Sequence, residues 1–305
     1  MNAPDLRGVT PALVTPFNED GSVDYDTVVS YTKWLKSIPG VTGVVVNAHA
    51  GEGTSLFEEE RREIIETVAA KVPDFHIVAG VSGEGTAVVA REAEMAKEAG
   101  AHSVLLFPAA SWTRFGYQKP AVSDRYRAVY DASELPIILF NWPNTTKATY
   151  SLDVLLELCA LDGVFAIKDG ARDMIRWDVE TPIIRQNFPD IQMLTCQDEF
   201  LLHTMWESDG ALVGYAALIP ELMVELLEKA KAHDYDAAKE AYDRMMPITR
   251  AVYHRESHME STMAMKLGLV ERGLLKNAIV RSPLMPLEAE ARGQVASALK
   301  SAGVI

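Results

Sequence analysis

One lysine stands near the end of the apolar run Val164-Phe-Ala-Ile-Lys-Asp-Gly170. Apolar residues followed by turn formers predict a buried strand, and burial disfavours the charged form of a lysine. Lys168 must therefore reach solvent, pair with a carboxylate such as Asp169, or serve as a reactive amine. Lowering its pKa from about 10.4 to about 7 by desolvation opposes the charged form by about 4 to 5 kcal/mol. The neutral amine can form a Schiff base with a carbonyl substrate.

Other side chains that could take part in chemistry also follow apolar runs. His49 follows the run 41–48, and it is either a general acid-base group near neutral pH or a plain polar loop residue. In Ala48-His-Ala-Gly-Glu-Gly53, small residues let the backbone N–H groups of Ala50 and Gly51 approach a carboxylate or phosphate. The remaining candidates at the ends of such runs are Glu52, Ser111, Phe140, Asn141, Cys196 and Tyr215.

Among these residues we expect only Lys168 to be a covalent nucleophile, since no Gly-x-Ser-x-Gly turn is present. The seven histidines are scattered, and His254 and His258 lack the glutamate of a zinc-binding His-Glu-x-x-His helix. Two cysteines provide neither a disulfide framework nor a Cys-x-x-Cys pair. We therefore expect neither a metal nor a cofactor.

The composition is that of an ordinary globular protein, with 305 residues, 48% hydrophobic and 24% charged. The net charge of −14, with no basic stretch, argues against nucleic acid or an anionic membrane as a partner. No run approaches the roughly 18 apolar residues of a membrane span, and the N-terminus lacks the apolar core of a signal peptide. We expect a cytoplasmic protein.

The elements that must position these residues alternate regularly along the chain. Eight apolar β-type runs are each followed by an amphipathic helical stretch, and Ser55 with Glu58 predicts a capping box at the start of the second helix. Eight such pairs predict an α/β fold, the (β/α)8 TIM barrel. The alternative, an open doubly wound sheet, lacks a Gly-x-Gly-x-x-Gly after its first strand. We expect strands over 8–17, 41–48, 76–82, 103–108, 136–142, 164–170, 191–195 and 211–217, and helices over 24–37, 55–71, 86–99, 119–132, 151–160, 174–186, 199–207 and 220–233.

After residue 234 the strand signals stop, and helices are expected over 235–254, 261–272 and 287–301. This pattern predicts a catalytic barrel domain over 1–233 and a C-terminal helical domain over 234–305. In such a barrel the active site lies at the C-terminal ends of the strands. That rule would bring Lys168 together with His49 and Tyr215.

From Gly8 to Ile305 the sequence resembles the dihydrodipicolinate synthase and N-acetylneuraminate lyase family of class I aldolases. The most specific matches are the strand 8–17, the pair Gly51-Glu52, Phe140-Asn-Trp-Pro143 and Ile167-Lys-Asp169. The resemblance implies a (β/α)8 barrel with a C-terminal helical domain, usually a homotetramer built as a dimer of dimers. It also implies that Lys168 forms an imine with pyruvate or another 2-oxo acid, which allows aldol cleavage or addition, dehydration or hydration.

The departures from this family bear on function. Members usually carry Gly-Thr-Thr-Gly-Glu where this chain has Ala48-His-Ala-Gly-Glu52, so two hydroxyls that hold the substrate carboxylate are missing. The proton-shuttling tyrosine falls on Phe140, which can neither donate nor accept a proton, and a second tyrosine falls near Ala110. The arginine that clamps the carboxylate of the aldehyde partner falls on Thr145. Cys196 stands where a glycine is common.

These departures argue against a typical dihydrodipicolinate synthase and leave two interpretations. In the first, the chain is a Schiff-base lyase whose acid-base group is His49 or, second, Tyr215. In the second, it is a non-catalytic protein that binds 2-oxo acids. We favour the enzyme, because an imidazole and apolar surface in place of two hydroxyls indicate a reshaped pocket.

The substrate class has alternatives as well. Apolar and aromatic residues around the expected pocket, such as Trp112, Phe140 and Trp142, favour an apolar or aromatic aldehyde partner. The tryptophans could instead pack at a subunit interface. A dehydratase of a 3-deoxy-2-oxo sugar acid is the main enzymatic alternative, and polar groups of Ser111, Asn141 and Thr145 would support it.

Overall fold

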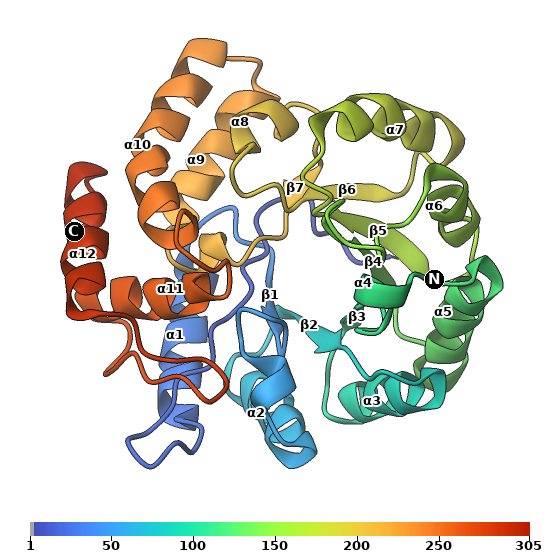
Figure 1. The fold of residues 1–305 in the computed structure, drawn as a ribbon, viewed down its shortest axis with the longest axis horizontal. Coiled ribbons are helices and arrows are strands. Elements are labelled where there is room, and N and C mark those ends of the chain that lie inside the picture. The colour runs from blue at the N-terminus through green and yellow to red at the C-terminus, as the bar shows by residue number, and fades with distance from the viewer. Residues whose placement is uncertain (1–2) are drawn as a thin grey trace.

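The computed structural model describes residues 3–305 and is built around a parallel sheet of seven strands, in the order β1 to β7 (Figure 1). Helices surround the ring of strands, as the expected (β/α)8 barrel requires. The strands are β1 (Gly43–Val46), β2 (His76–Val81), β3 (Ser103–Leu106), β4 (Ile137–Asn141), β5 (Val164–Asp169), β6 (Gln192–Thr195) and β7 (Gly210–Ala211). The helices around them are α1 (Tyr25–Ser37), α2 (Glu58–Lys71), α3 (Thr86–Glu98), α4 (Trp112–Phe115), α5 (Lys119–Ser133), α6 (Leu152–Cys159), α7 (Met174–Asn187), α8 (Leu201–Thr204) and α9 (Pro220–Lys231).

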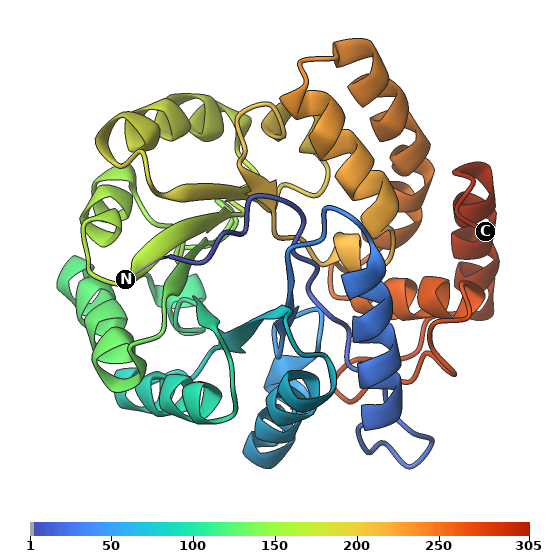
Figure 2. The same ribbon diagram turned by 180° about the vertical axis from the view of Figure 1, so that it is seen from behind.

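The segment expected as the first strand, 8–17, closes the barrel without forming a regular strand. Val9 makes isolated parallel bridges to Val41 and Ala211, and Ala12 bridges Val45. The segment therefore lies between β1 and β7. Figure 2 shows the dark blue chain from the N-terminal end crossing the back of the ring before it enters this gap. Pro11 interrupts the ladder because proline has no N–H to donate. The eighth position of the barrel is thus filled by an extended chain with sparse pairing.

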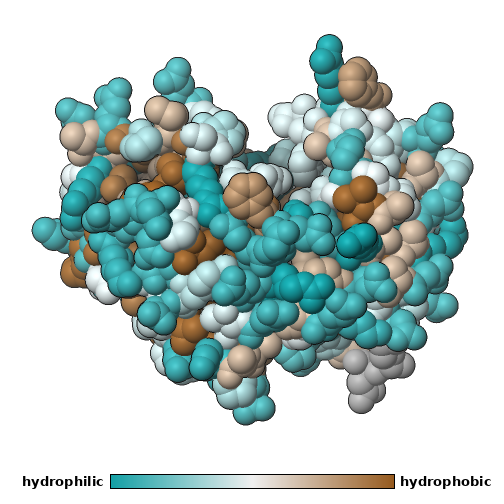
Figure 3. Space-filling model, turned by 90° about the horizontal axis from the view of Figure 1, so that it is seen from below, coloured by the Kyte–Doolittle hydropathy of each residue, from teal (hydrophilic) through white to brown (hydrophobic). Residues whose placement is uncertain are grey.

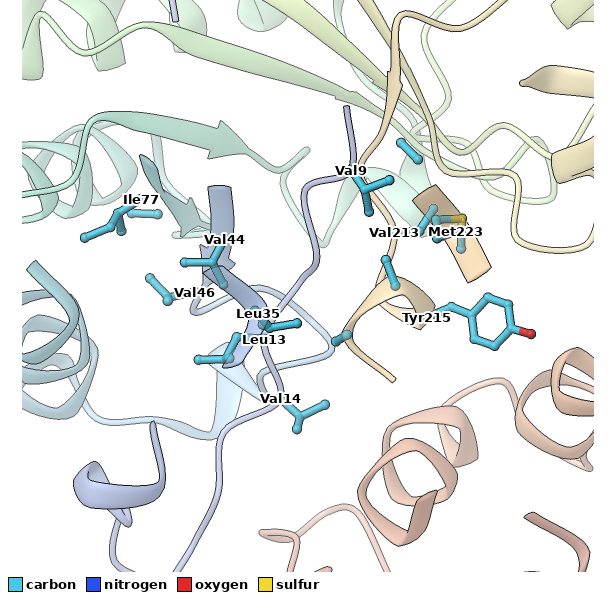
Figure 4. Packing of buried hydrophobic residues seen from close by; sticks show 14 of the residues in the cluster. Val9, Leu13, Val14, Leu35, Val44, Val46, Ile77, Val213, Tyr215 and Met223 are labelled. Carbon is cyan, nitrogen blue, oxygen red and sulfur yellow. The ribbon is translucent and has the colours of Figure 1, made fainter. Parts of the chain in front are cut away.

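Apolar side chains cover both faces of the sheet, as the strand sequences predict for a barrel. Val45, Val78 and Leu105 belong to the cluster inside the barrel. Val44 and Ile77, whose side chains point the other way, belong to the larger cluster beneath the helices (Figure 4). This alternation places successive side chains of each strand inside and outside the barrel.

Several local predictions need correction. Ser55 does not cap α2: it ends the 3-10 helix η1 (Gly53–Ser55), and α2 begins at Glu58. The capping contact is made instead by Glu60, whose carboxylate accepts the N–H of Phe57 at 2.9 Å. The helix expected over 199–207 is the four-residue α8.

The strand expected over 211–217 is also much shorter than predicted. Only Gly210–Ala211 is strand, and Tyr215–Ala217 forms the 3-10 helix η2. At Gly210 the backbone of the N-terminal segment is so close that a Cβ would lie 2.4 Å from the carbonyl oxygen of Gly8. After Val213 the chain turns at Gly214 into η2, so the side chain of Tyr215 no longer follows the alternation of a strand.

Three further helices follow α9, close to the expected ranges: α10 (Tyr235–Tyr253), α11 (Glu260–Glu271) and α12 (Ala289–Ser301). They pack on one another, and α10 also packs on α9 (Figure 1). The face in Figure 3 is mostly hydrophilic, with scattered apolar side chains. No helix within residues 3–305 is both long enough and apolar enough to cross a membrane.

A buried ion pair joins the loop after β1 to α11. Lys266 is fully buried, and its Nζ donates to Oε1 of Glu52 at 2.5 Å and to the carbonyl of Ile279 at 2.7 Å. The second oxygen of Glu52 accepts the N–H of Arg281 at 2.8 Å. Glu52 itself has a left-handed backbone, with φ of 55°. Burial lowers the pKa of Lys266 to about 8, although Glu52 opposes this shift.

We expect Lys266→Met to lower the free energy of unfolding by about 3 to 5 kcal/mol, because it leaves the Glu52 charge buried without its cationic partner. Combining it with Glu52→Gln should lose less than Lys266→Met alone, since no buried charge then remains. Urea unfolding followed by circular dichroism measures both effects. The control is Lys239→Met in the exposed pair with Asp243 on α10, which should leave stability nearly unchanged. An equally small loss for Lys266→Met would show that the buried pair is not a stabilising link.

Candidate active site

A cavity of about 490 Å³ opens at the C-terminal ends of the strands. Six of the candidate site residues named from the sequence lie on its wall: His49, Ala50, Glu52, Phe140, Lys168 and Cys196. They come from the ends of β4 and β5 and from the chain just after β1 and β6. The segments that complete the wall come from the C-terminal part and include Tyr253, His258, Met259, Ser261, Thr262, Met265, Pro283 and Leu284.

Lys168 lies on β5 in register with Phe140 of β4, and its residue exposure is only 6%. Its Nζ lies 3.9 Å from the centroid of the Phe140 ring. Within residues 3–305 this nitrogen has neither a hydrogen bond nor an ion pair to the protein. The face of an aromatic ring attracts a positive charge, so Phe140 can stabilise a cation at this nitrogen. The amine therefore faces the cavity without a carboxylate fixed to it.

Asp169, the carboxylate next to Lys168 in the sequence, forms hydrogen bonds with other residues and no ion pair with Lys168. Its Oδ1 accepts hydrogen bonds from the side chain of Gln197 at 2.6 Å and the N–H of Ala171 at 2.9 Å. Its Oδ2 accepts from the Asn141 amide at 3.2 Å. Burial raises the pKa of Asp169, while the bonds from Ala171 and Asn141 oppose the shift. Asp169 thus ties the ends of β4, β5 and the β6 loop together behind the cavity.

Asn141, which was expected to face the active site, lies behind the cavity wall instead. Asn141 is fully buried, and its Oδ1 accepts the N–H of Tyr150 at 3.1 Å while its Nδ2 binds Asp169. It does not line the cavity. Alternation along β4 explains the difference, because Phe140 points inward and its neighbour Asn141 points the other way.

His49 lies in the cavity wall, against aromatic rings. The centroid of its ring is 4.6 Å from that of Phe107 and 5.4 Å from that of Trp142. His49 is an exposed residue, because its ring faces the open cavity, although aromatic side chains flank it. Desolvation, followed by the charge of Lys168, lowers the pKa of His49 to about 4. At pH 7 the imidazole is therefore neutral, and it is a weak base rather than a group that titrates near neutrality.

The small-residue loop around Gly51 has the shape that anion binding needs. Within the described chain, neither the N–H of Ala50 nor that of Gly51 has a hydrogen-bond partner. Ala50 lines the cavity. A Cβ at Gly51 would lie 2.8 Å from the carbonyl oxygen of Leu13, so only glycine fits. Thr15 holds the loop by donating its hydroxyl to the carbonyl of Gly51 at 2.6 Å.

Three other expected site residues lie away from the cavity. The Tyr215 hydroxyl is fully buried and bonds the Met245 carbonyl at 3.0 Å and the Thr249 hydroxyl at 2.9 Å. Figure 4 shows its ring pointing away from the barrel strands. Ser111 is exposed next to α4, and its N–H donates to the Glu84 carboxylate at 3.2 Å. Thr145 is exposed, and its neighbour Thr146 lines the cavity instead.

The polar part of the cavity was not foreseen from the sequence. Arg172 follows β5 with a left-handed backbone, and its Nη2 donates to Oδ2 of Asp198 at 2.7 Å. Its Nε donates to Glu199 at 3.1 Å. Tyr253 donates its hydroxyl to Oδ1 of Asp198 at 2.9 Å. Arg172 and Asp198 follow strand ends, so the rule that active-site residues lie at the C-terminal ends of barrel strands could have found them. Tyr253 could not, because it ends a helix about fifty residues later.

The thiol of Cys196 lies on the cavity wall between the lysine and this polar group. Desolvation raises its pKa to about 11, Lys168 opposes that shift, and Asp198 adds to it. Cys196 is therefore a neutral thiol at pH 7. The side chain acts as a small wall residue rather than as a nucleophile.

Trp142 lines the cavity, with its ring 6.0 Å from that of Phe140, whereas Trp112 on α4 packs with its ring tilted against that of Tyr117 and does not line it. One of the two tryptophans thus belongs to the pocket. No group of three or more His, Cys, Asp or Glu side chains that could hold a metal ion occurs between residues 3 and 305.

Known proteins resemble this chain over its whole length. The model of the dihydrodipicolinate synthetase family matches residues 5–302. The 4-hydroxy-tetrahydrodipicolinate synthase of Phenylobacterium zucineum is 30% identical, with 100% of both chains covered. That of Bartonella bacilliformis is 28% identical, with 98% of this chain and 99% of the relative covered.

Solved structures agree with the fold. The chloride-inhibited dihydrodipicolinate synthase of Acinetobacter baumannii, complexed with pyruvate, superposes with a TM-score of 0.87 at 26% identity, covering 99% of this chain and 100% of that chain. A monomeric dihydrodipicolinate synthase variant superposes with a TM-score of 0.90 and full coverage of both chains. At 19% identity, this second likeness concerns the fold alone.

We expect Lys168→Met to raise the pKa of His49 above its value of about 4 by removing a nearby positive charge. It should remain below the ordinary value of about 6.5, since desolvation is the larger cause. Titration of the imidazole by two-dimensional ¹H–¹⁵N NMR measures both values. Lys119→Met, at an exposed position on α5, should leave the His49 titration unchanged. An unchanged titration in Lys168→Met would mean that the two side chains do not interact.

Proposed function

Since this chain belongs to the dihydrodipicolinate synthetase family, we propose that it is a Schiff-base lyase that joins Lys168 to pyruvate or a related 2-oxo acid. The observation that carries the proposal is Lys168, a residue that is 6% exposed, lines a cavity of about 490 Å³ and has no fixed anionic partner within residues 3–305. A lysine in such a place can become a nucleophile once its proton leaves. The pyruvate complex of the Acinetobacter baumannii relative supports the choice of substrate.

The surroundings of Lys168 suit the formation of a protonated imine. The neutral amine attacks the C2 carbonyl, and loss of water leaves a protonated imine. The Phe140 face, 3.9 Å from Nζ, can stabilise the positive charge of that imine. The C2 carbon then draws electrons from a bond two carbons away, or from a C–H bond at C3, to form an enamine.

The loop at Ala50 and Gly51 supports binding of the carboxylate of the 2-oxo acid. Within residues 3–305 the N–H groups of Ala50 and Gly51 have no partner, and Ala50 lines the cavity, so the loop could donate to an anion there. This mode of binding needs only backbone atoms. It therefore tolerates the alanine and histidine that replace two threonines of the family pattern.

We also propose that the reaction differs from that of a typical dihydrodipicolinate synthase. Phe140 has no hydroxyl with which to shuttle a proton, and Thr145 lies outside the cavity. Aromatic rings at His49, Phe140 and Trp142 instead form an apolar wall. This wall supports an apolar or aromatic aldehyde as the carbonyl partner in aldol cleavage or formation.

A specific observation favours each of two alternative functions, a dehydratase and a non-catalytic binding protein. The polar wall of Asp198, Ser261 and Thr262 would suit the hydroxyls of a 3-deoxy-2-oxo sugar acid, and thus a dehydratase. The residues first considered for that role, Ser111, Asn141 and Thr145, lie outside the cavity. The neutral His49 and the absent tyrosine would suit a protein that binds 2-oxo acids without turnover.

We further propose that the chain forms a homo-oligomer, the homotetramer that the family resemblance implies. Ile175 and Val179 lie one turn apart on α7 and are 79% and 55% exposed, and Phe115 on α4 is 72% exposed. Exposed apolar side chains are buried in a subunit contact where they gather into one patch, and the neighbours Ile175 and Val179 support such a contact. Light scattering of the purified chain measures its mass, and a monomer, as in the variant that shares this fold, would contradict the proposal.

Sodium borohydride added with pyruvate should trap a stable adduct on Lys168, located by peptide mass mapping. Lys168→Arg should abolish the adduct, because a guanidinium stays protonated and is not nucleophilic. Lys266 is the internal control, since it is fully buried against Glu52 and does not line the cavity. A wild-type protein that gives no adduct at Lys168 would overturn the Schiff-base proposal.

Turnover assays then separate the three functions for a protein that gives the adduct. Cleavage or synthesis with apolar or aromatic aldehydes indicates an aldolase, and water loss from 3-deoxy-2-oxo sugar acids indicates a dehydratase. An adduct without turnover of either class supports the binding protein and contradicts the proposed lyase.

A further inference from the structure

The imine chemistry proposed above needs a group that takes a proton from C3 of the bound 2-oxo acid and returns it. The inference that follows rests on that proposed function. Phe140 carries no ionisable group, and Cys196, with a pKa of about 11, is a poor base at neutral pH. His49, with a pKa of about 4, would have to become an imidazolium close to the cationic Lys168 imine. The proton carrier must therefore be sought elsewhere on the cavity wall.

The polar wall holds a carboxylate and a phenol in direct contact. Asp198 lies two residues after Cys196 and is 4% exposed, and Tyr253 at the end of α10 is 8% exposed. Both side chains line the same cavity as Lys168. The Tyr253 hydroxyl donates to Oδ1 of Asp198 at 2.9 Å. A phenol held in this way can accept a proton on its oxygen while its own proton moves to the carboxylate.

The groups around Asp198 fix its orientation and balance its charge. Arg172 donates to the other oxygen, Oδ2, at 2.7 Å, and the Arg172 Nη2 also lies 3.2 Å from Nε2 of His258. Glu199 shares the guanidinium with Asp198. Burial raises the pKa of Asp198, and Arg172 opposes that shift. The neutral acid form of Asp198 is thus made more accessible. Burial and, after it, the charge of Asp198 raise the pKa of Tyr253 and disfavour a phenolate.

We propose that Tyr253, acting with Asp198, moves the C3 proton of the Lys168 imine in place of the tyrosine that Phe140 replaces. The C3–H bond breaks, and its electron pair forms the C2=C3 bond of the enamine as the imine π pair returns to nitrogen. The released proton goes to the Tyr253 oxygen while the phenol proton passes to Oδ1 of Asp198. Both groups end neutral, and reversal of the same transfer returns a proton to C3. Tyr253 is the catalytic residue, and Asp198 positions it and stores the proton.

Pyruvate alone tests this assignment without knowledge of the second substrate. In D₂O, an active relay exchanges the methyl hydrogens of pyruvate for deuterium, which ¹H NMR follows directly. Borohydride trapping on the same samples reports the imine separately. We expect Tyr253→Phe and Asp198→Asn to trap pyruvate on Lys168 as the wild type does, but to lose at least about 100-fold in exchange rate, the lower end of what general acid-base groups contribute.

The matched control is Tyr242→Phe. Tyr242 lies on the same helix, and its hydroxyl donates to the Glu199 carbonyl at 2.8 Å, but it does not line the cavity. This variant should exchange like the wild type. The pH dependence of the exchange rate distinguishes a catalytic role of Asp198 from a structural one. The wild-type exchange rate should fall as the pH drops below the pKa of Asp198. Asp198→Asn should show no such fall at acidic pH.

The outcomes separate the two proposals. A wild-type protein that traps no pyruvate overturns the Schiff-base function and this assignment with it. Trapping with wild-type exchange in Tyr253→Phe, or trapping in the wild type with no exchange above the uncatalysed rate, overturns this assignment alone. Loss of exchange in His49→Gln with normal exchange in Tyr253→Phe would transfer the role to His49. If Tyr253→Phe fails to trap, Asp198→Asn, which keeps an acceptor for the Tyr253 hydroxyl, decides the question in its place.

Discussion

The proposed chemistry depends on an amine that is surrounded by protein and has no carboxylate attached to it. Burial of an unpaired ammonium is unfavourable, and the protein reduces this cost through the aromatic face of Phe140 and through an opening to a cavity. Asp169, the adjacent carboxylate, is kept from Lys168 by three hydrogen bonds on the other side of the strand. Alternation along β5 is what separates the two side chains. A lysine ion pair at this point would have removed the nucleophile.

The loss of the tyrosine at position 140 has consequences across the cavity. The Phe140 ring still supports a cation at Nζ, but it carries no group that could transfer a proton. On the polar wall of the same cavity, Arg172, Asp198 and Tyr253 form one hydrogen-bonded group, which is the group proposed for that role. The cavity therefore has an apolar side beside His49 and Trp142 and a charged side after β6. A substrate with one apolar end would be oriented by this asymmetry.

The helices after the barrel are part of the site rather than an appendage to it. Tyr253 comes from the end of α10, and Ser261, Thr262 and Met265 come from α11. The buried pair of Lys266 and Glu52 joins α11 to the loop that carries His49 and Ala50. A shift of α11 would move both walls of the cavity at once. This coupling gives a physical reason why a barrel of this kind would keep its C-terminal helices.

Much of this protein was determined by the sequence alone. The alternation of apolar runs and amphipathic helices predicts the barrel, because each run must be buried on both faces and each helix on one. The same pattern places Lys168, His49, Phe140 and Cys196 at strand ends, and the cavity brings these four together. The positions of α10, α11 and α12 were also predictable, since helical periodicity is a local property of the chain.

Tertiary structure alone decided which neighbours at those strand ends face the cavity. Asn141 and Tyr215 passed the strand-end rule, but the first bonds Asp169 behind the wall and the second bonds α10 after the chain leaves β7 as a 3-10 helix. The N-terminal segment closes the barrel with isolated bridges because Pro11 interrupts its ladder. Tyr253 meets Asp198 across 55 residues of chain. Contacts of that kind follow from how α10 packs on the barrel, and no local pattern in the sequence encodes them.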